Sequence, residues 1–310
     1  MSTKPVFQRG VNFTAERPDV YGTPGAIKQL ERLPGYGINA ISLVPYGFTR
    51  AGTPMVRLPG PGSWERDEGL IELGQRAHEL DMFVLLKPQI WVGGGAGSFP
   101  GSLDFPVAAD REAWFASYAM FVDHYAALAT RMKADLYCVG TEFVKLSAHE
   151  KQWRSLIARA RQKTSAPLTY AATQGPEFET LAFWDALDYI GLNNYYPLPD
   201  TLDASGVVAK VAAVQKKYRK PVVLTEAGYA SLEAPHKAPW DETPRKVSLE
   251  DQSRCYEAIF QAFYKQPWFM GMYWWKVGTN GYGGPTDGSH TPWGKPAMEV
   301  VKKWYRSGGR

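Results

Sequence analysis

The chain has few of the residues on which disulfide-rich or metal-dependent proteins are built. Only two of its 310 residues are cysteines, Cys138 and Cys255, and neither has a neighbour that would complete a CxxC or zinc pattern. The five histidines show no HxH or HExxH spacing. These shortages exclude a disulfide scaffold, and we expect neither a metal site nor a cofactor.

Long apolar runs and a strong charge excess are also missing. No run of about 18 apolar residues occurs, and the first ten residues, MSTKPVFQRG, lack the apolar core of a signal peptide. We therefore expect a soluble, cytoplasmic monomer without a membrane partner, secreted only if an export signal has been removed. The net charge is +4, and the one basic cluster, VKKWYRSGGR at 301–310, is interpreted as an exposed last helix with a frayed end. Because no basic stripe or binding motif accompanies it, we expect no nucleic-acid partner.

Aromatic residues, at 14%, and short apolar runs are plentiful. Most of these runs are apolar almost throughout, which is typical of strands covered on both faces in a parallel sheet. The eight runs span 6–13, 38–46, 82–91, 135–143, 167–173, 187–196, 221–229 and 268–277. Their alternation with helical stretches predicts a (β/α)8 barrel, with a doubly wound open sheet as the alternative.

Helix starts and loop lengths support the same architecture. Thr23 before Pro24, Ser147 with Glu150 three residues later, and Ser248 each indicate a helix N-cap. Connections from helix to strand are short, whereas those leaving the strands are long and rich in glycine and proline. In a barrel these long loops gather on the C-terminal face, where such enzymes carry out their chemistry. Without an internal repeat or linker, we expect one catalytic domain over residues 1–310.

Two of the predicted strands end on a glutamate. Glu142 follows LYCVGT and Glu226 follows VVLT, at the ends of the fourth and seventh predicted strands. Either glutamate alone fits a first-turn acid of the next helix equally well. Two carboxylates at the open end of one barrel are, however, the groups required for glycoside hydrolysis, one protonated as an acid and one ionised as a nucleophile.

Aromatic side chains gather at the same predicted rim, where they suit the C–H faces of sugars. Trp91 ends the third run, and Tyr195 and Tyr196 end the sixth. In the eighth run we expect one of Trp274 and Trp275 to face the barrel mouth and the other to pack behind it. Lys87 on the third run is interpreted as an exposed or substrate-binding cation rather than as a Schiff-base lysine.

These motifs together resemble a known family. VGTEF, DYIGLNNYYPL, VVLTEAGYAS, MYWWK and WGKPA are similar, in order and spacing, to glycoside hydrolase family 113. This is a family of retaining β-mannanases in the large clan of (β/α)8 glycosidases that carry catalytic glutamates on strands four and seven. The resemblance runs from RGVNF on the first strand to the last helix.

The resemblance implies that Glu142 is the general acid/base and Glu226 the nucleophile of a double displacement. It also implies that Tyr196 or Tyr195 bonds the nucleophile. Much of the clan has an asparagine before the acid/base, whereas this chain has Thr141. That departure leaves the partner of the sugar 2-hydroxyl open between Asn194 and Lys87.

The expected function is cleavage of β-1,4-mannan or manno-oligosaccharides, so that an oligosaccharide or polysaccharide is the expected partner. Two alternatives stay open. The first is a glycosidase of the same clan that acts on another β-glycan, such as a glucan, a galactan or an amino-sugar polymer. The second is a carbohydrate-binding barrel without turnover, because a fold and a motif do not guarantee activity.

Overall fold

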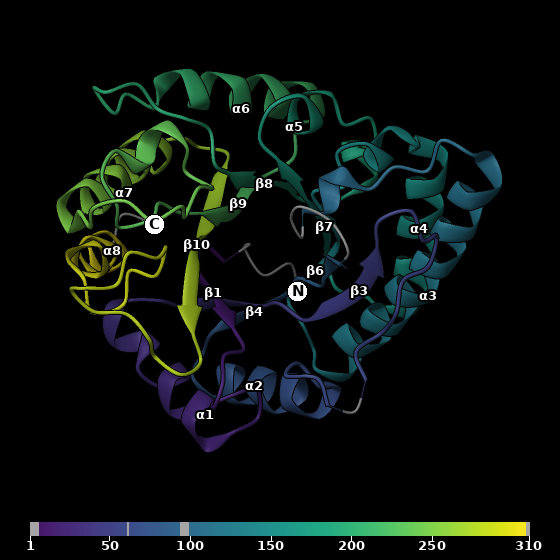
Figure 1. Ribbon diagram of the computed structural model, residues 1–310, viewed down its shortest axis with the longest axis horizontal. Helices are drawn as coiled ribbons and strands as arrows, with labels where there is room; N and C mark the ends of the chain where they lie inside the picture. Colours follow the sequence, from purple (N-terminus) through teal and green to yellow (C-terminus); the bar gives the residue numbers. More distant parts are fainter. Residues whose placement is uncertain (1–5, 61, 94–98, 308–310) are drawn as a thin grey trace.

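The protein forms a closed barrel of parallel strands, described here from a computed structural model (Figure 1). The structure describes residues 6–60, 62–93 and 99–307. Within them, neighbouring barrel strands pair in chain order, and the last closes on the first. The (β/α)8 barrel is confirmed over the open sheet. The barrel strands are β1 (Gln8–Thr14), β2 (Ala40–Leu43), β4 (Phe83–Leu86), β6 (Leu136–Thr141), β7 (Leu168–Thr173), β8 (Ile190–Asn194), β9 (Val222–Ala227) and β10 (Phe269–Gly278).

Helices surround the strands as an outer ring (Figure 1). Thr23 and Ser248 cap α1 and α7, and their side chains accept hydrogen bonds from Ala26 N and Asp251 N. The capping box expected at Ser147 is wrong, because α4 begins after His149 and Ser147 lies in a 3-10 turn. The helices are α1 (Pro24–Leu30), α2 (Asp67–Glu79), α3 (Ala108–Arg131), α4 (Glu150–Lys163), α5 (Pro176–Thr180), α6 (Ser205–Tyr218), α7 (Leu249–Phe263) and α8 (Pro296–Arg306).

The third predicted strand, 82–91, is two strands. Its first part is β4, which ends at Leu86, and its second part is β5 (Gln89–Gly93). Pro88, between them, has no N–H to donate to a ladder, while Lys87 N and Gln89 N on either side donate to Leu43 O and Pro45 O at 2.9 and 2.8 Å. β5 pairs instead with β3 (Tyr46–Arg50) in a separate two-stranded parallel sheet. Trp91 therefore belongs to this added sheet and not to the barrel.

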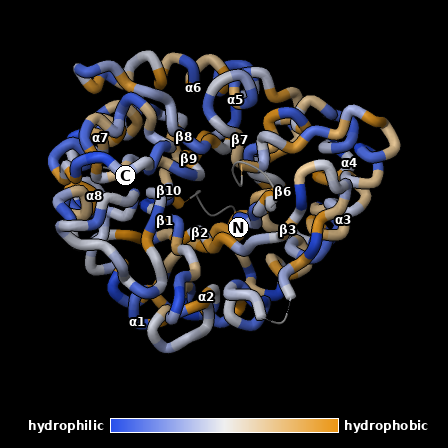
Figure 2. The backbone as a smooth tube through the Cα atoms, in the orientation of Figure 1, coloured by the Kyte–Doolittle hydropathy of each residue, from blue (hydrophilic) through white to orange (hydrophobic). Residues whose placement is uncertain are grey.

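The core has two layers. Small and medium apolar side chains fill the barrel, among them Leu85, Leu136 and Val223, while a larger cluster lies between barrel and helices. In Figure 2 β2 is hydrophobic, and the outer helices alternate between hydrophobic and hydrophilic positions. Because the barrel strands are buried on both faces, most of the apolar runs in the sequence do not alternate between apolar and polar residues.

The basic C-terminal segment is less exposed than expected. Helix α8 turns Met298, Val301 and Tyr305 inward, and the Tyr305 hydroxyl donates to Gly10 O at 3.0 Å. Its lysines face outward, so the segment packs against the barrel through one face. The end of this segment, 308–310, lies outside the described residues. None of the helices in the described ranges is long and apolar enough to cross a membrane.

An aromatic cluster fixes helix α4 against the strand that carries Glu142. Trp153 is fully buried and lies against Tyr170 and Phe143, with ring centroids 5.1 and 5.6 Å away. Its indole N–H donates to Leu146 O at 3.0 Å. The ring also stacks on Phe183 at 5.5 Å. Packing of this density leaves a cavity when a large ring is removed.

We expect Trp153→Ala to lower the free energy of unfolding by about 3–5 kcal/mol, because a buried indole and its hydrogen bond are lost. Thermal unfolding followed by circular dichroism measures the effect as a fall in Tm. Met120→Ala on α3 is the control, since Met120 is 68% exposed and its removal leaves no internal cavity. Equal Tm values for the two variants would show that the cluster does not hold α4 in place.

Candidate active site

A cavity of about 710 Å³ opens at the C-terminal end of the barrel. It is walled by ends of barrel strands, by β5 and by the long loops that follow the strands. Both predicted catalytic glutamates reach it. Its lining residues are Tyr46, Gln89, Ile90, Trp91, Phe99, Pro100, Glu142, Thr173, Gln174, Tyr195, Glu226, Trp240, Glu242, Trp275, Lys276 and His290.

Glu226 lies at the end of β9 with donors around its carboxylate. Lys87 Nζ and Gln89 Nε2 both donate to Oε1, the latter at 2.9 Å, and Tyr195 Oη donates to Oε2 at 2.7 Å. Glu226 is 5% exposed and Lys87 is fully buried. An ionised carboxylate is an acceptor-only group, and these three donors match it.

A register shift directs the Glu226 side chain. Leu192 on β8 pairs with Leu224, but Asn193 pairs with Glu226, so Thr225 is an extra residue on β9. A bulge of this kind re-aims the side chain that follows it. The Thr225 hydroxyl then donates to Asn193 Oδ1 at 2.8 Å, which links the two strand ends.

Glu142 occupies a different environment. It follows β6, again after a register shift, and its backbone is left-handed with φ of 56°. Such a conformation is costly for a residue with a Cβ and is held by its surroundings. Asn193 Nδ2 donates to Oε1 at 3.1 Å. Burial, and then the nearby charge of Glu226, raise the pKa of Glu142 to about 8, so the carboxyl retains its proton at neutral pH.

Lys87 and Tyr195 contact the Glu226 carboxylate directly. Lys87, predicted as an exposed or substrate-binding cation, is enclosed below Glu226 in an ion pair. Its Nζ is engaged by the Glu226 carboxylate inside the protein and is not the free amine that a Schiff base requires. Tyr195 is the tyrosine that bonds Glu226, so the choice left open between the two tyrosines falls on Tyr195.

Tyr196 and Asn194 lie outside the cavity lining, and so does Trp274, which confirms the expectation that one of Trp274 and Trp275 packs away from the barrel mouth. Tyr196 donates to Glu179 at 2.7 Å on the helical side of the strand end. Asn194 is buried with 1% exposure, outside the cavity lining. Trp274 is fully buried and stacks on Tyr256, with ring centroids 3.7 Å apart. All three positions follow from strand alternation, because the neighbouring residues Tyr195, Asn193 and Trp275 take the inward side.

Trp275 and Trp91 present aromatic surface to the cavity. The Trp275 ring centroid is 5.2 Å from Lys87 Nζ. Trp91 is 50% exposed and packs edge-on against Tyr46 with centroids 6.1 Å apart. Exposed indole faces at a polar cleft suit the C–H faces of sugar rings.

Several residues of the site were not predicted from the sequence. Asn193, which bonds Glu142, adjoins the predicted Asn194, and only the register distinguishes them. Gln89 reaches Glu226 from β5. Glu242 and His290 come from two long loops and pair through His290 Nδ1 at 2.6 Å, which lowers the pKa of Glu242 to about 2. Contacts between long loops have no signal in a single sequence.

A smaller cavity of about 450 Å³ continues from the first. The two share Tyr46, Trp91 and Lys276. Trp64 and Phe48 add aromatic surface that is 37% and 42% exposed, and Glu16 bonds Lys276 at 2.7 Å. The cleft therefore extends from Glu226 toward the loops after β1 and β2, away from β6.

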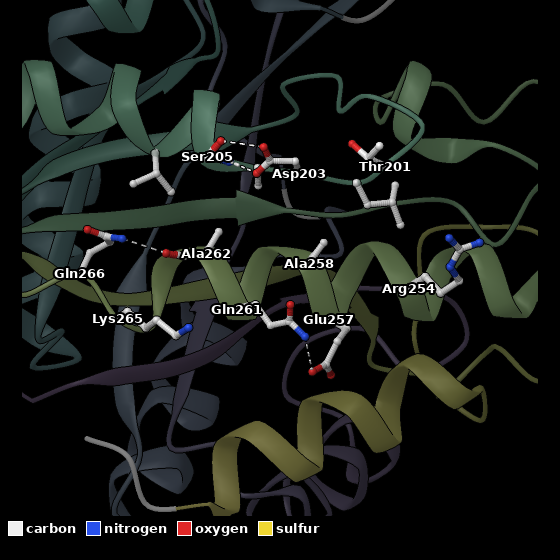
Figure 3. A pocket seen from close by; sticks show the side chains of 13 residues that line it. Thr201, Asp203, Ser205, Arg254, Glu257, Ala258, Gln261, Ala262, Lys265 and Gln266 are labelled. Carbon is white, nitrogen blue, oxygen red and sulfur yellow. Dashed lines mark hydrogen bonds between the residues drawn. The ribbon is translucent and has the colours of Figure 1, made fainter.

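A third hollow, of about 670 Å³, lies outside the barrel between α7 and the loop before α6 (Figure 3). Its polar groups bond one another, as Ser205 does with Asp203 and Gln261 with Glu257. The described parts of the chain contain no group of three or more His, Cys, Asp or Glu side chains arranged to hold a metal ion.

Comparison with solved structures gives close neighbours along the whole chain. The GH113 β-mannanase AaManA from Alicyclobacillus acidocaldarius, in complex with ManMIm, is 32% identical over 97% of each chain, with a TM-score of 0.88. A GH113 β-1,4-mannanase is 27% identical over 97% of this chain and 99% of its own, with a TM-score of 0.86. A β-glucuronidase from Faecalibacterium prausnitzii, 16% identical, shares the fold alone over 97% of this chain and 49% of its own, with a TM-score of 0.68.

No curated protein matches the chain significantly. A sequence model of Glycoside Hydrolase Family 113, in contrast, matches residues 12–290. This span includes every barrel strand except the first residues of β1. The resemblance inferred from the sequence motifs is thereby confirmed. The chain belongs to glycoside hydrolase family 113 and is a glycoside hydrolase.

Proposed function

We propose that the protein hydrolyses β-1,4-mannan or manno-oligosaccharides with retention of configuration, with Glu226 as nucleophile and Glu142 as general acid/base. The observation that carries the proposal is the contrast between the two carboxyl groups in one cavity. Three donors surround Glu226, whereas burial raises the pKa of Glu142 to about 8. In glycosidases, two carboxyl groups whose environments move their pKa values apart take different roles. The one that stays ionised is the base or nucleophile, and the one that stays protonated is the acid.

In the first step Glu226 attacks the anomeric carbon while Glu142 gives its proton to the leaving oxygen. In the second, Glu142 removes a proton from water, which attacks the anomeric carbon of the glycosyl-enzyme and releases Glu226. Two inversions at one carbon retain the β configuration. The retaining route requires a carboxyl separation of about 5 to 5.5 Å, against roughly 6.5 to 9.5 Å for the inverting route.

The hydrogen bonds that Glu226 accepts change in strength during the two steps. Lys87 and Tyr195 orient the carboxylate before substrate arrives. When the covalent bond forms, one oxygen of Glu226 loses its charge, and these contacts weaken. They strengthen again as the carboxylate leaves in the second step. Rigid donors aimed at developing charge contribute without reorganisation during the reaction.

Mannose specificity is supported by the likeness to family 113 β-mannanases, which include a structure 32% identical over nearly the full length. Trp275 and Trp91 supply surfaces for sugar rings, and the continuation of the cleft past Trp64 supplies room for further residues of the chain. Because that continuation runs away from the acid/base, it suits the sugars on the non-reducing side of the cleaved bond.

Product analysis with short β-1,4-linked manno-, gluco-, xylo- and chito-oligosaccharides tests activity and specificity together. Wild type is expected to cleave the manno-series. Glu226→Gln is expected to lose activity by about 10⁴-fold or more, because the nucleophile is gone, while its Tm shows a folded protein. Preference for another series would reject mannan as the substrate. Binding of a sugar that neither protein cleaves would favour a binding barrel without turnover.

The pH dependence of kcat/KM tests the role of Glu142. Because its pKa is raised to about 8, the protonated acid is available below that pH, and activity on oligosaccharides is expected to fall as pH rises through it. Glu142→Gln is expected to lower kcat/KM by about 10²–10⁴-fold and to abolish the alkaline limb. An unchanged alkaline limb in this variant would assign it to a different group.

A further inference from the structure

A second buried carboxyl group lies behind Glu142. Glu177, on helix α5, is 4% exposed. Its Oε1 accepts from Tyr170 Oη and its Oε2 from Thr173 N, both at 2.7 Å. A five-residue helix offers little dipole to stabilise an acid, and burying a carboxyl group is costly unless it is well bonded.

A chain of hydrogen bonds connects this carboxyl to the backbone of Glu142. The Tyr170 hydroxyl, which donates to Glu177, accepts from Phe143 N at 2.9 Å. Phe143 N belongs to the peptide group that directly follows Glu142. On its other side, Glu142 N donates to Ala171 O at 2.9 Å. These two contacts hold the left-handed backbone from which the Glu142 side chain enters the cavity.

The charge of Glu177 acts on the same group. Three charged groups act on Glu142. They are Glu226 of β9, Glu177 of α5 and Lys87, which follows β4, and the amide of Asn193 also bonds Glu142. Both glutamates raise the pKa of Glu142, and Lys87 lowers it. Burial raises the pKa of Glu177 itself to about 7. Glu177 is thus mostly ionised at the pH where Glu142 titrates, and its negative charge opposes loss of the Glu142 proton.

We propose that Glu177 is a positioning residue for Glu142, which it holds in place through Tyr170 and keeps protonated through its own negative charge. The inference rests on the proposed role of Glu142 as acid/base. Glu177 does not line the cavity, and its bonds are to Tyr170, to the backbone of Thr173 and to Ser147.

The test compares Glu177→Gln with Glu179→Gln in the full-length enzyme. Glu179 is a matched control on the same helix, because it also accepts from a tyrosine hydroxyl, that of Tyr196, but faces Lys210 and solvent. We measure kcat/KM on a manno-oligosaccharide from acidic to alkaline pH. Glu177→Gln is expected to move the alkaline limb to lower pH, since a negative charge beside Glu142 is removed. Glu179→Gln is expected to reproduce the wild-type profile.

A Glu177→Gln profile that superimposes on wild type would overturn the proposal and leave Glu177 a structural residue, whereas one that falls by the same factor at every pH would contradict the effect of its charge on the Glu142 proton. If this variant does not fold, Tyr170→Phe tests the same link. It is expected to lower kcat by about tenfold or more at similar KM, through misplacement of the acid. An unchanged kcat would contradict the link.

Failure of the underlying function gives a different result. If Glu142 is not the acid/base, Glu142→Ala retains the alkaline limb and hydrolyses oligosaccharides like wild type, whatever Glu177→Gln does. If Glu142 is the acid/base and only the inference is wrong, Glu142→Ala loses the limb while Glu177→Gln leaves it unmoved.

Discussion

The buried contact between Lys87 and the Glu226 carboxylate is the interaction on which the site depends. It joins residues 139 positions apart, from β4 and β9, on opposite sides of the barrel mouth. Breaking a buried ion pair by removing one partner typically costs about 3–5 kcal/mol. Gln89 and Tyr195 complete the set from two further elements. The carboxylate is fixed because three donors, two from the β4–β5 segment and one from the end of β8, converge on it.

Glu142 is the same type of residue as Glu226, but the groups around its carboxyl differ because of its position in the fold. The same side chain, in the same kind of strand end, has one amide donor in place of an ammonium, an amide and a hydroxyl. Burial and neighbouring carboxylates then favour the protonated form. A single residue type thus provides an acid and a carboxylate in one cavity, and Asn193 connects them through its bonds to Glu142 and Thr225.

The barrel and the two glutamates were predictable because each depends on a local pattern that the fold repeats. Parallel strands buried on both faces produce the apolar runs, and their ends meet at one face, so Glu142 and Glu226 had to lie near each other. The side chains around them were harder to assign. Tyr195 and Tyr196, Asn193 and Asn194, and Trp274 and Trp275 are neighbours, and a register shift of one residue exchanges which faces inward.

Other parts of the site have no local pattern. Gln89 lies on β5, which pairs with β3 apart from the barrel sheet, and reaches Glu226 from there. Glu242 meets His290 across two long loops, and Glu177 reaches Glu142 through a tyrosine on another strand. These contacts are set by tertiary packing, so spacing along a single chain carries no trace of them.

The central claim is that Glu226 forms a covalent bond with the sugar while Glu142 supplies and then removes a proton. Proton NMR of the first anomer released from a β-1,4-manno-oligosaccharide tests it most directly. Retention predicts that the β anomer accumulates first and then mutarotates. Release of the α anomer first would show a single inversion at the anomeric carbon and would contradict the account.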